Sequence, residues 1–161
     1  KPKLNFNLKL VKLKREKPQF KNLKYKKILS YLSKMDNSKS DIALVSNKKI
    51  LETGTSNLLF VKNQKFFTPK KDYYEGNTYK FFKTKIKRIG KKDILLKELN
   101  DYDEILLIGS GKGVTSVRTI NELNWKRKNL NKFKFLSNQY NVAINECDTY
   151  RFWKKEIIYQ P

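Results

Sequence analysis

Four short polar segments of this chain carry the residue types that could do chemistry. Lys21 supplies an amine, which can bond covalently to a carbonyl carbon, and Glu52 supplies a carboxylate directly after a short apolar run. Two glycine turns follow, Gly76-Asn-Thr78 and Gly109-Ser-Gly-Lys-Gly113. Backbone N–H groups in glycine turns and at helix starts bind phosphate well, because no side chain blocks their approach. The four segments thus supply an amine, an acid and two turns of the kind that can bind an anion.

The composition excludes several other kinds of site. The chain has no histidine and a single cysteine, Cys147. A Ser-His-Asp triad, a Cys-His pair, a histidine metal site and a thiolate zinc cluster are therefore ruled out, and we predict no metal ligands. One cysteine forms no internal disulfide, which is typical of a reducing compartment, and we expect the cytoplasm. No apolar run reaches the length of a membrane span, so we expect no membrane partner.

The net charge of +22 favours a polyanionic partner, since 37 residues are Lys or Arg and only 15 are Asp or Glu. Only five of these 37 residues are arginine, the side chain whose planar fork grips phosphate oxygens in pairs. The lysines are spread over nearly every segment, together with many Asn and Ile residues, as an AT-rich coding sequence would produce. We therefore do not expect nucleic acid as the partner, and we keep a non-enzymatic basic domain that binds nucleic acid as the alternative of another class.

The polar segments lie between predicted strands and predicted helices. Alternating apolar residues from Leu4 to Leu10 predict a strand, and apolar residues at helical spacing predict a helix within Leu23–Met35. Similar patterns predict a helix that opens at Gly76 and has Phe81, Phe82, Ile86 and Ile89 on its apolar face, a helix at about Asn129–Ile144, and strands at Ile42–Val45, Ile50–Leu51, Leu58–Val61, Lys65–Thr68, Ile94–Leu99, Glu104–Ile108 and Val114–Thr119. A length of 161 residues suits one α+β domain.

The order and spacing of these segments resemble the pyridoxal-phosphate half of class IV aminotransferases and aminodeoxychorismate lyases. Lys21, with aromatic Tyr25 four positions later, resembles the family's Schiff-base lysine and precedes Glu52 by 31 positions. The run from Glu52 through Ser56 and Asn57 resembles a motif whose glutamate pairs with the pyridine nitrogen of the cofactor. The resemblance implies that Lys21 is catalytic and that Lys21, Glu52, Ser56 and Asn57 bind the cofactor.

Lys17 and Lys24 lie on either side of Lys21 and are alternatives for the Schiff-base lysine. The local sequence does not separate the three amines.

The two glycine turns resemble the family's phosphate-binding turns. Asn77 stands where the family has isoleucine in its Gly-Ile-Thr-Arg turn, and Tyr79 stands where it has arginine. The resemblance implies that Asn77, Thr78, Ser110 and Gly111 bind the cofactor phosphate. The pattern of a nucleoside-triphosphate loop fails at the second turn, because Lys112 is followed by glycine rather than serine or threonine.

The resemblance implies an α+β fold with a mixed, mainly antiparallel sheet or barrel-like core and flanking helices. It implies a pyridoxal-phosphate-dependent enzyme acting on a small-molecule amino substrate. The loop Gly109–Val114 favours an aminodeoxychorismate lyase, which forms p-aminobenzoate and pyruvate. The alternative is a branched-chain or D-amino-acid aminotransferase.

The resemblance also bears on how the chain is organised. We expect residues 1–161 to form the cofactor domain alone, without the family's N-terminal domain, so that this chain turns over little by itself. We expect a homodimer in the full-length form.

Overall fold

The computed structural model describes residues 3–20 and 25–147. Its strands are β1 (Lys3–Lys12), β2 (Ser40–Ser46), β3 (Lys49–Thr53), β4 (Asn57–Lys62), β5 (Lys65–Pro69), β6 (Ile89–Lys92), β7 (Ile94–Leu95), β8 (Glu104–Gly109), β9 (Gly113–Ile120) and β10 (Trp125–Lys126). Its α-helices are α1 (Lys26–Leu32), α2 (Asn77–Lys85) and α3 (Asn131–Asn145), and 3-10 turns span Leu96–Asp101 and Asn121–Leu123. The predicted helix within Leu23–Met35 is thus shorter, and residues 21–24 lie outside the described part.

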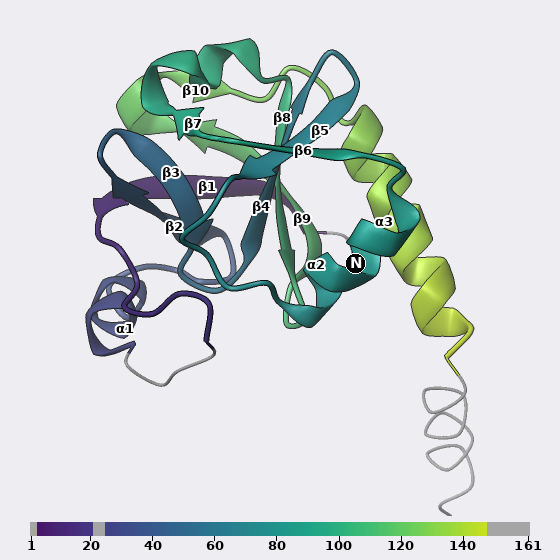
Figure 1. Cartoon of the computed structure of the whole chain (residues 1–161), viewed down its shortest axis with the longest axis horizontal. Coiled ribbons are helices and arrows are strands. Elements are labelled where there is room, and N and C mark those ends of the chain that lie inside the picture. Colours follow the sequence, from purple (N-terminus) through teal and green to yellow (C-terminus); the bar gives the residue numbers. More distant parts are fainter. Residues whose placement is uncertain (1–2, 21–24, 148–161) are drawn as a thin grey trace, which may run out of the picture.

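The strands form one mixed sheet that curls towards closure. Their order is β6-β5-β4-β8-β9-β1-β2-β3-β7, with β10 added beside β9. The pairs β1–β2, β1–β9 and β5–β6 are parallel, and the other pairs are antiparallel. Only Asp93 separates β6 from β7, so the two ends of the strand order lie close together. This confirms the predicted mixed, mainly antiparallel sheet with a barrel-like core (Figure 1).

The central strands are apolar along their whole length because both of their faces are covered. In β4, Leu58 and Phe60 face the core inside the curled sheet, whereas Leu59 and Val61 face the opposite side. The same alternation occurs in β8, and β2 divides its residues between the inner core and a third cluster under α1. The short apolar runs of the sequence are therefore strands buried on both sides.

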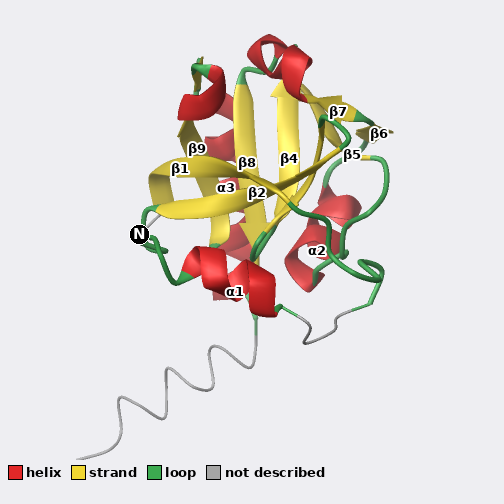
Figure 2. Cartoon of the chain, turned by 90° about the vertical axis from the view of Figure 1, so that its left-hand side faces the viewer, coloured by secondary structure: helices red, strands yellow, loops and turns green. Residues whose placement is uncertain are grey.

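The helices flank the sheet on different sides. Helix α1 lies on one side and α3 on the other, with α3 behind the strands when α1 faces the viewer (Figures 1 and 2). Helices α2 and α3 contribute to the same hydrophobic cluster, to which α2 supplies Tyr79 and Phe82 and α3 supplies Phe133 and Leu136. No helix in the described ranges has the length and apolar character needed to cross a membrane.

Two sequence-based expectations were wrong in detail. The predicted strand Ile94–Leu99 is a two-residue strand, β7, followed by a 3-10 turn. Leu96 and Leu99 stand three positions apart, which puts both on one face of a 3-10 turn, and both pack on the inner core. Ile89, expected on the helix face with Phe82, instead begins β6, because α2 ends at Lys85.

The buried carboxylate of Glu104 joins the sheet to α3. Glu104 is fully buried in β8, and its two oxygens accept hydrogen bonds from the backbone N–H groups of Lys132 (2.8 Å) and Phe133 (2.9 Å). These N–H groups belong to the first turn of α3 and have no partner within the helix. Burial raises the pKa of the Glu104 carboxyl, and the two N–H donors oppose that rise. Glu104 therefore caps a helix that is distant from it in the sequence.

We expect Glu104→Ala to lower the free energy of unfolding by about 2 kcal/mol, because the variant removes the acceptor of one buried and one partly buried backbone N–H group. Urea unfolding measures this loss. Glu98→Ala is the matched control, since the ion pair of Glu98 with Lys92 is long (3.6 Å) and partly exposed, and the variant should cost less than about 0.5 kcal/mol. Equal losses in the two variants would show that the carboxylate does not cap α3.

Candidate functional site

The topology brings the predicted turns to one end of the sheet. Strands β4, β8 and β9 are neighbours, and the first residue of β4, Asn57, pairs with Ile108 near the end of β8. Gly109 ends β8 and pairs with Gly113, which begins β9. The β3–β4 turn and the β8–β9 turn therefore lie side by side, although about fifty residues separate them in the sequence.

A cavity of about 390 Å³ opens between these turns and helix α1. Apolar side chains of α1, Ile28, Leu29 and Leu32, line one wall. The polar wall contains every predicted cofactor-binding residue that the structure describes, namely Glu52, Ser56, Asn57, Asn77, Thr78, Ser110 and Gly111. The predicted cofactor-binding residues within the described part of the chain thus line one cavity.

Glu52 supplies a buried acid at this cavity. Its side chain is 4% exposed, and its Oε1 accepts a hydrogen bond from Nε of Arg15 at 2.6 Å. Its Oε2 accepts a longer bond from the backbone N–H of Tyr74 at 3.4 Å. Burial raises the pKa of Glu52, and the positive charge of Arg15 opposes this rise. Arg15 therefore favours the charged form of a carboxyl that burial alone would tend to protonate.

Asn57 holds the loop that leads into α2. Its Nδ2 donates to the backbone oxygen of Tyr74, and its Oδ1 accepts the N–H of Gly76 at 3.0 Å. The nitrogen and the oxygen of the Asn57 amide thus bind backbone groups of two residues, Tyr74 and Gly76, that lie two positions apart. Asn57 lines the cavity, and its observed role is to fix the position of the Gly76 turn.

The two glycine turns meet at their hydroxyl groups. The Oγ1 of Thr78, in the first turn of α2, lies 3.2 Å from the Oγ of Ser110. Thr78 belongs to the first turn of α2, whose backbone N–H groups have no acceptor within the helix. The N-cap residue, Gly76, offers them no side-chain acceptor either. Helix dipole and free donors both favour an anion here. Asn77, Ser110 and Gly111 are exposed, which leaves this end of the cavity open to a ligand.

A glycine is needed at position 109 for the turns to approach so closely. A Cβ atom placed on Gly109 would lie 2.7 Å from Oγ of Ser56, closer than such atoms can come. Ser56 is itself buried, and its backbone N–H donates to Oγ1 of Thr53 at 2.7 Å. The close packing of Ser56 on Gly109 therefore joins the β3–β4 turn to the β8–β9 turn.

The predicted lysine cannot be placed in this geometry. Lys21 and its alternative Lys24 lie outside the described residues. The other alternative, Lys17, is described and exposed, and it is not among the described residues that line the cavity. The described chain does bring Tyr25, directly after this segment, to the cavity wall.

Comparison with known proteins identifies the family. Residues 4–120 match the family described as amino-transferase class IV. The chain belongs to this family. Its members are pyridoxal-phosphate enzymes that act as aminotransferases or lyases. No curated protein matches the sequence.

Solved structures of class IV enzymes share the fold at low sequence identity. A branched-chain aminotransferase from Thermoproteus uzoniensis superposes with a TM-score of 0.77 at 15% identity, covering 92% of this chain and 55% of that one. A branched-chain aminotransferase from Thermobaculum terrenum, in its PLP form, gives 0.74 at 18%, covering 92% and 54%. A 4-amino-4-deoxychorismate lyase from Pseudomonas aeruginosa gives 0.69 at 18%, covering 84% and 54%. This chain therefore spans about half the length of these relatives.

The described residues fit the cofactor that the family uses. Pyridoxal phosphate needs an acid for its ring nitrogen and donors for its phosphate. The cavity offers the buried, partly charge-compensated Glu52 for the first, and the Thr78 and Ser110 turns for the second. Gly111 leaves its part of the turn open, because a Cβ atom placed there would meet no other atom within 4 Å. These residues could hold the ring and the phosphate.

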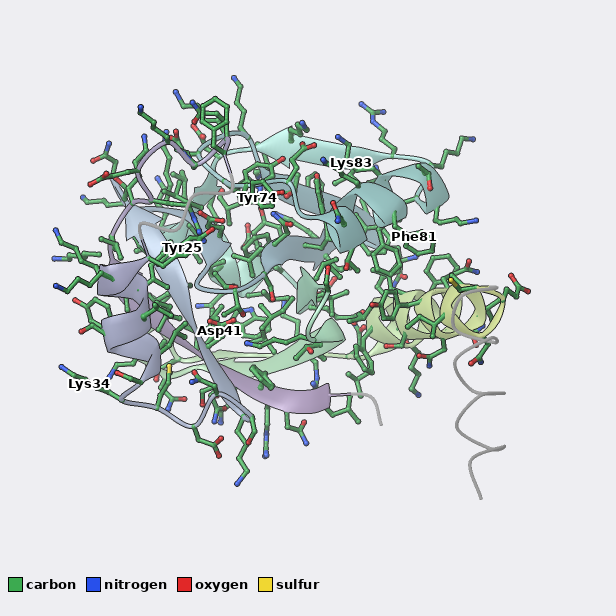
Figure 3. The ribbon with its side chains drawn as sticks, turned by 90° about the horizontal axis from the view of Figure 1, so that it is seen from below. Tyr25, Lys34, Asp41, Tyr74, Phe81 and Lys83 are labelled. Carbon is green, nitrogen blue, oxygen red and sulfur yellow. The ribbon has the colours of Figure 1, made fainter. Side chains whose placement is uncertain are left out.

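Three residues that line the cavity, Arg15, Tyr25 and Tyr74, were not predicted from the sequence as site residues. Arg15 is 8% exposed, pairs with Glu52, and stacks its guanidinium over the ring of Tyr25 at 4.5 Å from the centroid. Tyr74 contacts Glu52 and Asn57 through its backbone. Tyr25 and Tyr74 are labelled in Figure 3 and line the same cavity. Arg15 lies in a run of basic residues that gives it no local signature, although arginine is rare in this chain.

The raised pKa of Glu52 predicts a pH effect on stability. Because the folded-state pKa lies above the ordinary value of 4.5, the contribution of this carboxyl is fully present below 4.5 and is lost as the pH rises through the folded-state pKa. Glu52→Gln lacks this loss. We therefore expect the free energy of unfolding of the wild type to fall relative to that of the variant as the pH rises above 4.5. Urea unfolding of both proteins across this pH range measures the difference, and a constant or opposite trend would contradict the assignment.

Proposed function

We propose that this chain forms the pyridoxal-phosphate-binding part of a class IV enzyme, with aminodeoxychorismate lyase as the favoured activity. The alternative activity is that of a branched-chain or D-amino-acid aminotransferase. The proposal includes a small amino compound as substrate and a homodimer as the full-length form. The main support is the convergence of Glu52 and the Thr78 and Ser110 turns on one cavity.

Each polar residue of the cavity has a part in this proposal. Bound pyridoxal phosphate supplies an electron sink for a substrate carbanion. Glu52 would hold the proton on the ring nitrogen, and Arg15 would keep Glu52 charged for that purpose. Thr78, Ser110 and the backbone of Gly111 would bind the phosphate oxygens. The Nζ of Lys21 would anchor the cofactor and move the proton at the substrate carbon.

The lyase and transferase activities share this machinery. In the lyase reaction, removal of a ring proton from 4-amino-4-deoxychorismate lets pyruvate leave and yields p-aminobenzoate. Support for the lyase is the Gly109–Val114 sequence, which is more lyase-like in pattern. The fold favours neither activity, because solved structures of both kinds superpose on the chain.

The cofactor proposal predicts a covalent label on Lys21. Incubation of the chain with pyridoxal phosphate, borohydride reduction, proteolysis and mass spectrometry should find a pyridoxyl group on Lys21, because Tyr25, four positions later in the sequence, lines the cavity that would hold the ring and the phosphate. Lys21→Ala should lose this label entirely. Lys24→Ala is the matched control and should keep it.

Two results would contradict this prediction. A label on Lys17 or Lys24 in the wild type would move the anchoring role to that residue. Random labelling of exposed lysines, equal in both variants, would remove the support for a cofactor site. Tight, salt-sensitive binding to arbitrary duplex DNA in the same protein would then favour the basic-domain hypothesis.

The choice between lyase and transferase is a separate prediction. We expect the chain loaded with pyridoxal phosphate to form p-aminobenzoate and pyruvate from 4-amino-4-deoxychorismate, with Lys21→Ala reduced on the order of a hundredfold or more. Fluorescence of p-aminobenzoate measures this rate. Formation of 2-oxo acids from branched-chain or D-amino acids, without p-aminobenzoate, would assign a transferase instead. The rate should be low, since about half of the relatives' length is not in this chain.

A further inference from the structure

The carboxylate of Asp41 is buried beneath the cavity, at a point where two turns of the chain meet. Asp41 lies in β2 and has no exposed surface. Its Oδ2 accepts hydrogen bonds from Oγ1 of Thr53 (3.1 Å), Oγ1 of Thr55 (2.7 Å) and Nζ of Lys112 (2.7 Å). Thr53 ends β3, Thr55 belongs to the β3–β4 turn, and Lys112 belongs to the β8–β9 turn. One buried oxygen therefore holds both turns, and Figure 3 labels the residue.

Lys112 compensates the charge of Asp41 and fixes the β8–β9 turn. Its side chain is only 12% exposed, and its ammonium also lies over the ring of Phe6, 4.8 Å from the centroid. Its backbone N–H donates to the oxygen of Gly109 at 3.1 Å, which closes the turn that carries Ser110 and Gly111. A long, flexible lysine side chain held at both ends in this way limits the movement of the turn.

The β3–β4 turn is fixed to the same strand at a second place. The N–H of Gly54 donates to the backbone oxygen of Ile42 at 3.0 Å. A Cβ atom on Gly54 would lie 3.0 Å from the Ile42 side chain and 3.2 Å from Oδ1 of Asp41, so the turn packs directly on β2. Within the connection itself, Oγ1 of Thr53 accepts a hydrogen bond from the N–H of Ser56, which ties the end of β3 to the residue before β4.

We infer that Asp41, paired with Lys112, is a positioning residue that sets the spacing of the two turns at the phosphate end of the cavity. Neither Asp41 nor Lys112 is among the residues that line the cavity, whereas Thr55, Ser56, Gly109 and Gly111 are. The pair therefore reaches the cavity through the turns that it holds rather than by lining it. The inference rests on the proposed function, since it assumes that these turns bind the cofactor phosphate.

Removing only one partner of the buried Asp41–Lys112 ion pair is expected to destabilise the fold. Removal of Lys112 leaves the Asp41 carboxylate buried with hydroxyl and backbone donors alone, and a single unpaired buried charge is strongly destabilising. A variant in which both charges are removed separates the positioning effect from that penalty. In this variant Asp41→Asn keeps an oxygen that can accept from Thr53 and Thr55, whereas Lys112→Met removes the link to the β8–β9 turn.

The test compares ligand affinity with stability in the full chain. The variants are Lys112→Met, Lys112→Arg and the double variant Asp41→Asn with Lys112→Met. The matched control is Lys49→Met, because Lys49 also makes a 2.7 Å ion pair, with Asp93, but lies away from this cavity. Titration calorimetry gives the dissociation constants of pyridoxal phosphate and of inorganic phosphate, and urea unfolding gives the stability.

We expect Lys112→Met and the double variant to bind both ligands on the order of tenfold more weakly, the lower end of what loss of an outer-shell partner costs a site. Lys112→Arg should restore most of the affinity, since it keeps the cation. Lys49→Met should bind like the wild type. A purely structural role would lower the stability of the Lys112 variants and leave the dissociation constants of the folded protein unchanged.

The two proposals fail in different ways. Wild-type affinity in the folded double variant would overturn the positioning role and leave the proposed function standing. A wild-type chain that binds neither pyridoxal phosphate nor phosphate would overturn both, because its turns would then form no anion site.

Discussion

The close contact of two turns at one end of the sheet is the constraint on which the rest of the site depends. Ser56 packs on Gly109 at a distance that admits no side chain at position 109. Strand pairing puts the turns in the same place, since β4 and β9 both neighbour β8. The Asp41 carboxylate then holds both from below through Thr55 and Lys112. These contacts bring backbone N–H groups and small hydroxyls together, and groups of this kind bind anions in other proteins.

The second constraint is electrostatic. Glu52 is buried, and burial by itself favours the neutral carboxyl. In this chain Arg15 contacts Glu52 at 2.6 Å and opposes that tendency, while the ring of Tyr25 covers the guanidinium. Glu52 and Asp41 thus share one arrangement, a buried carboxylate with one basic partner and further neutral donors. A chain of net charge +22 has many cations, but only those brought in by the fold reach these positions.

Much of the fold could be predicted because its strongest signals are local. The runs Ile42–Val45 and Leu58–Val61 are strands, as their length and branched apolar residues indicate. The errors occur where local pattern and packing disagree. Leu96 and Leu99 form a 3-10 turn rather than a strand because their spacing suits one face of that turn on the core. The roles of Arg15 and Asp41 leave no local pattern in the sequence, since their ion-pair partners, Glu52 and Lys112, lie at distant points in the chain.

The sequence by itself determined the class of site: an acid after a strand, two glycine turns and a lysine upstream, in an order that resembles the class IV family. Residue types and spacing carry that information because each piece is local. Only the tertiary structure decided that Glu52, Thr78 and Ser110 share one cavity, and that Arg15, Asp41 and Lys112 support them. Those contacts depend on which strands become neighbours, and strand order follows from burial of the whole sheet rather than from any one segment.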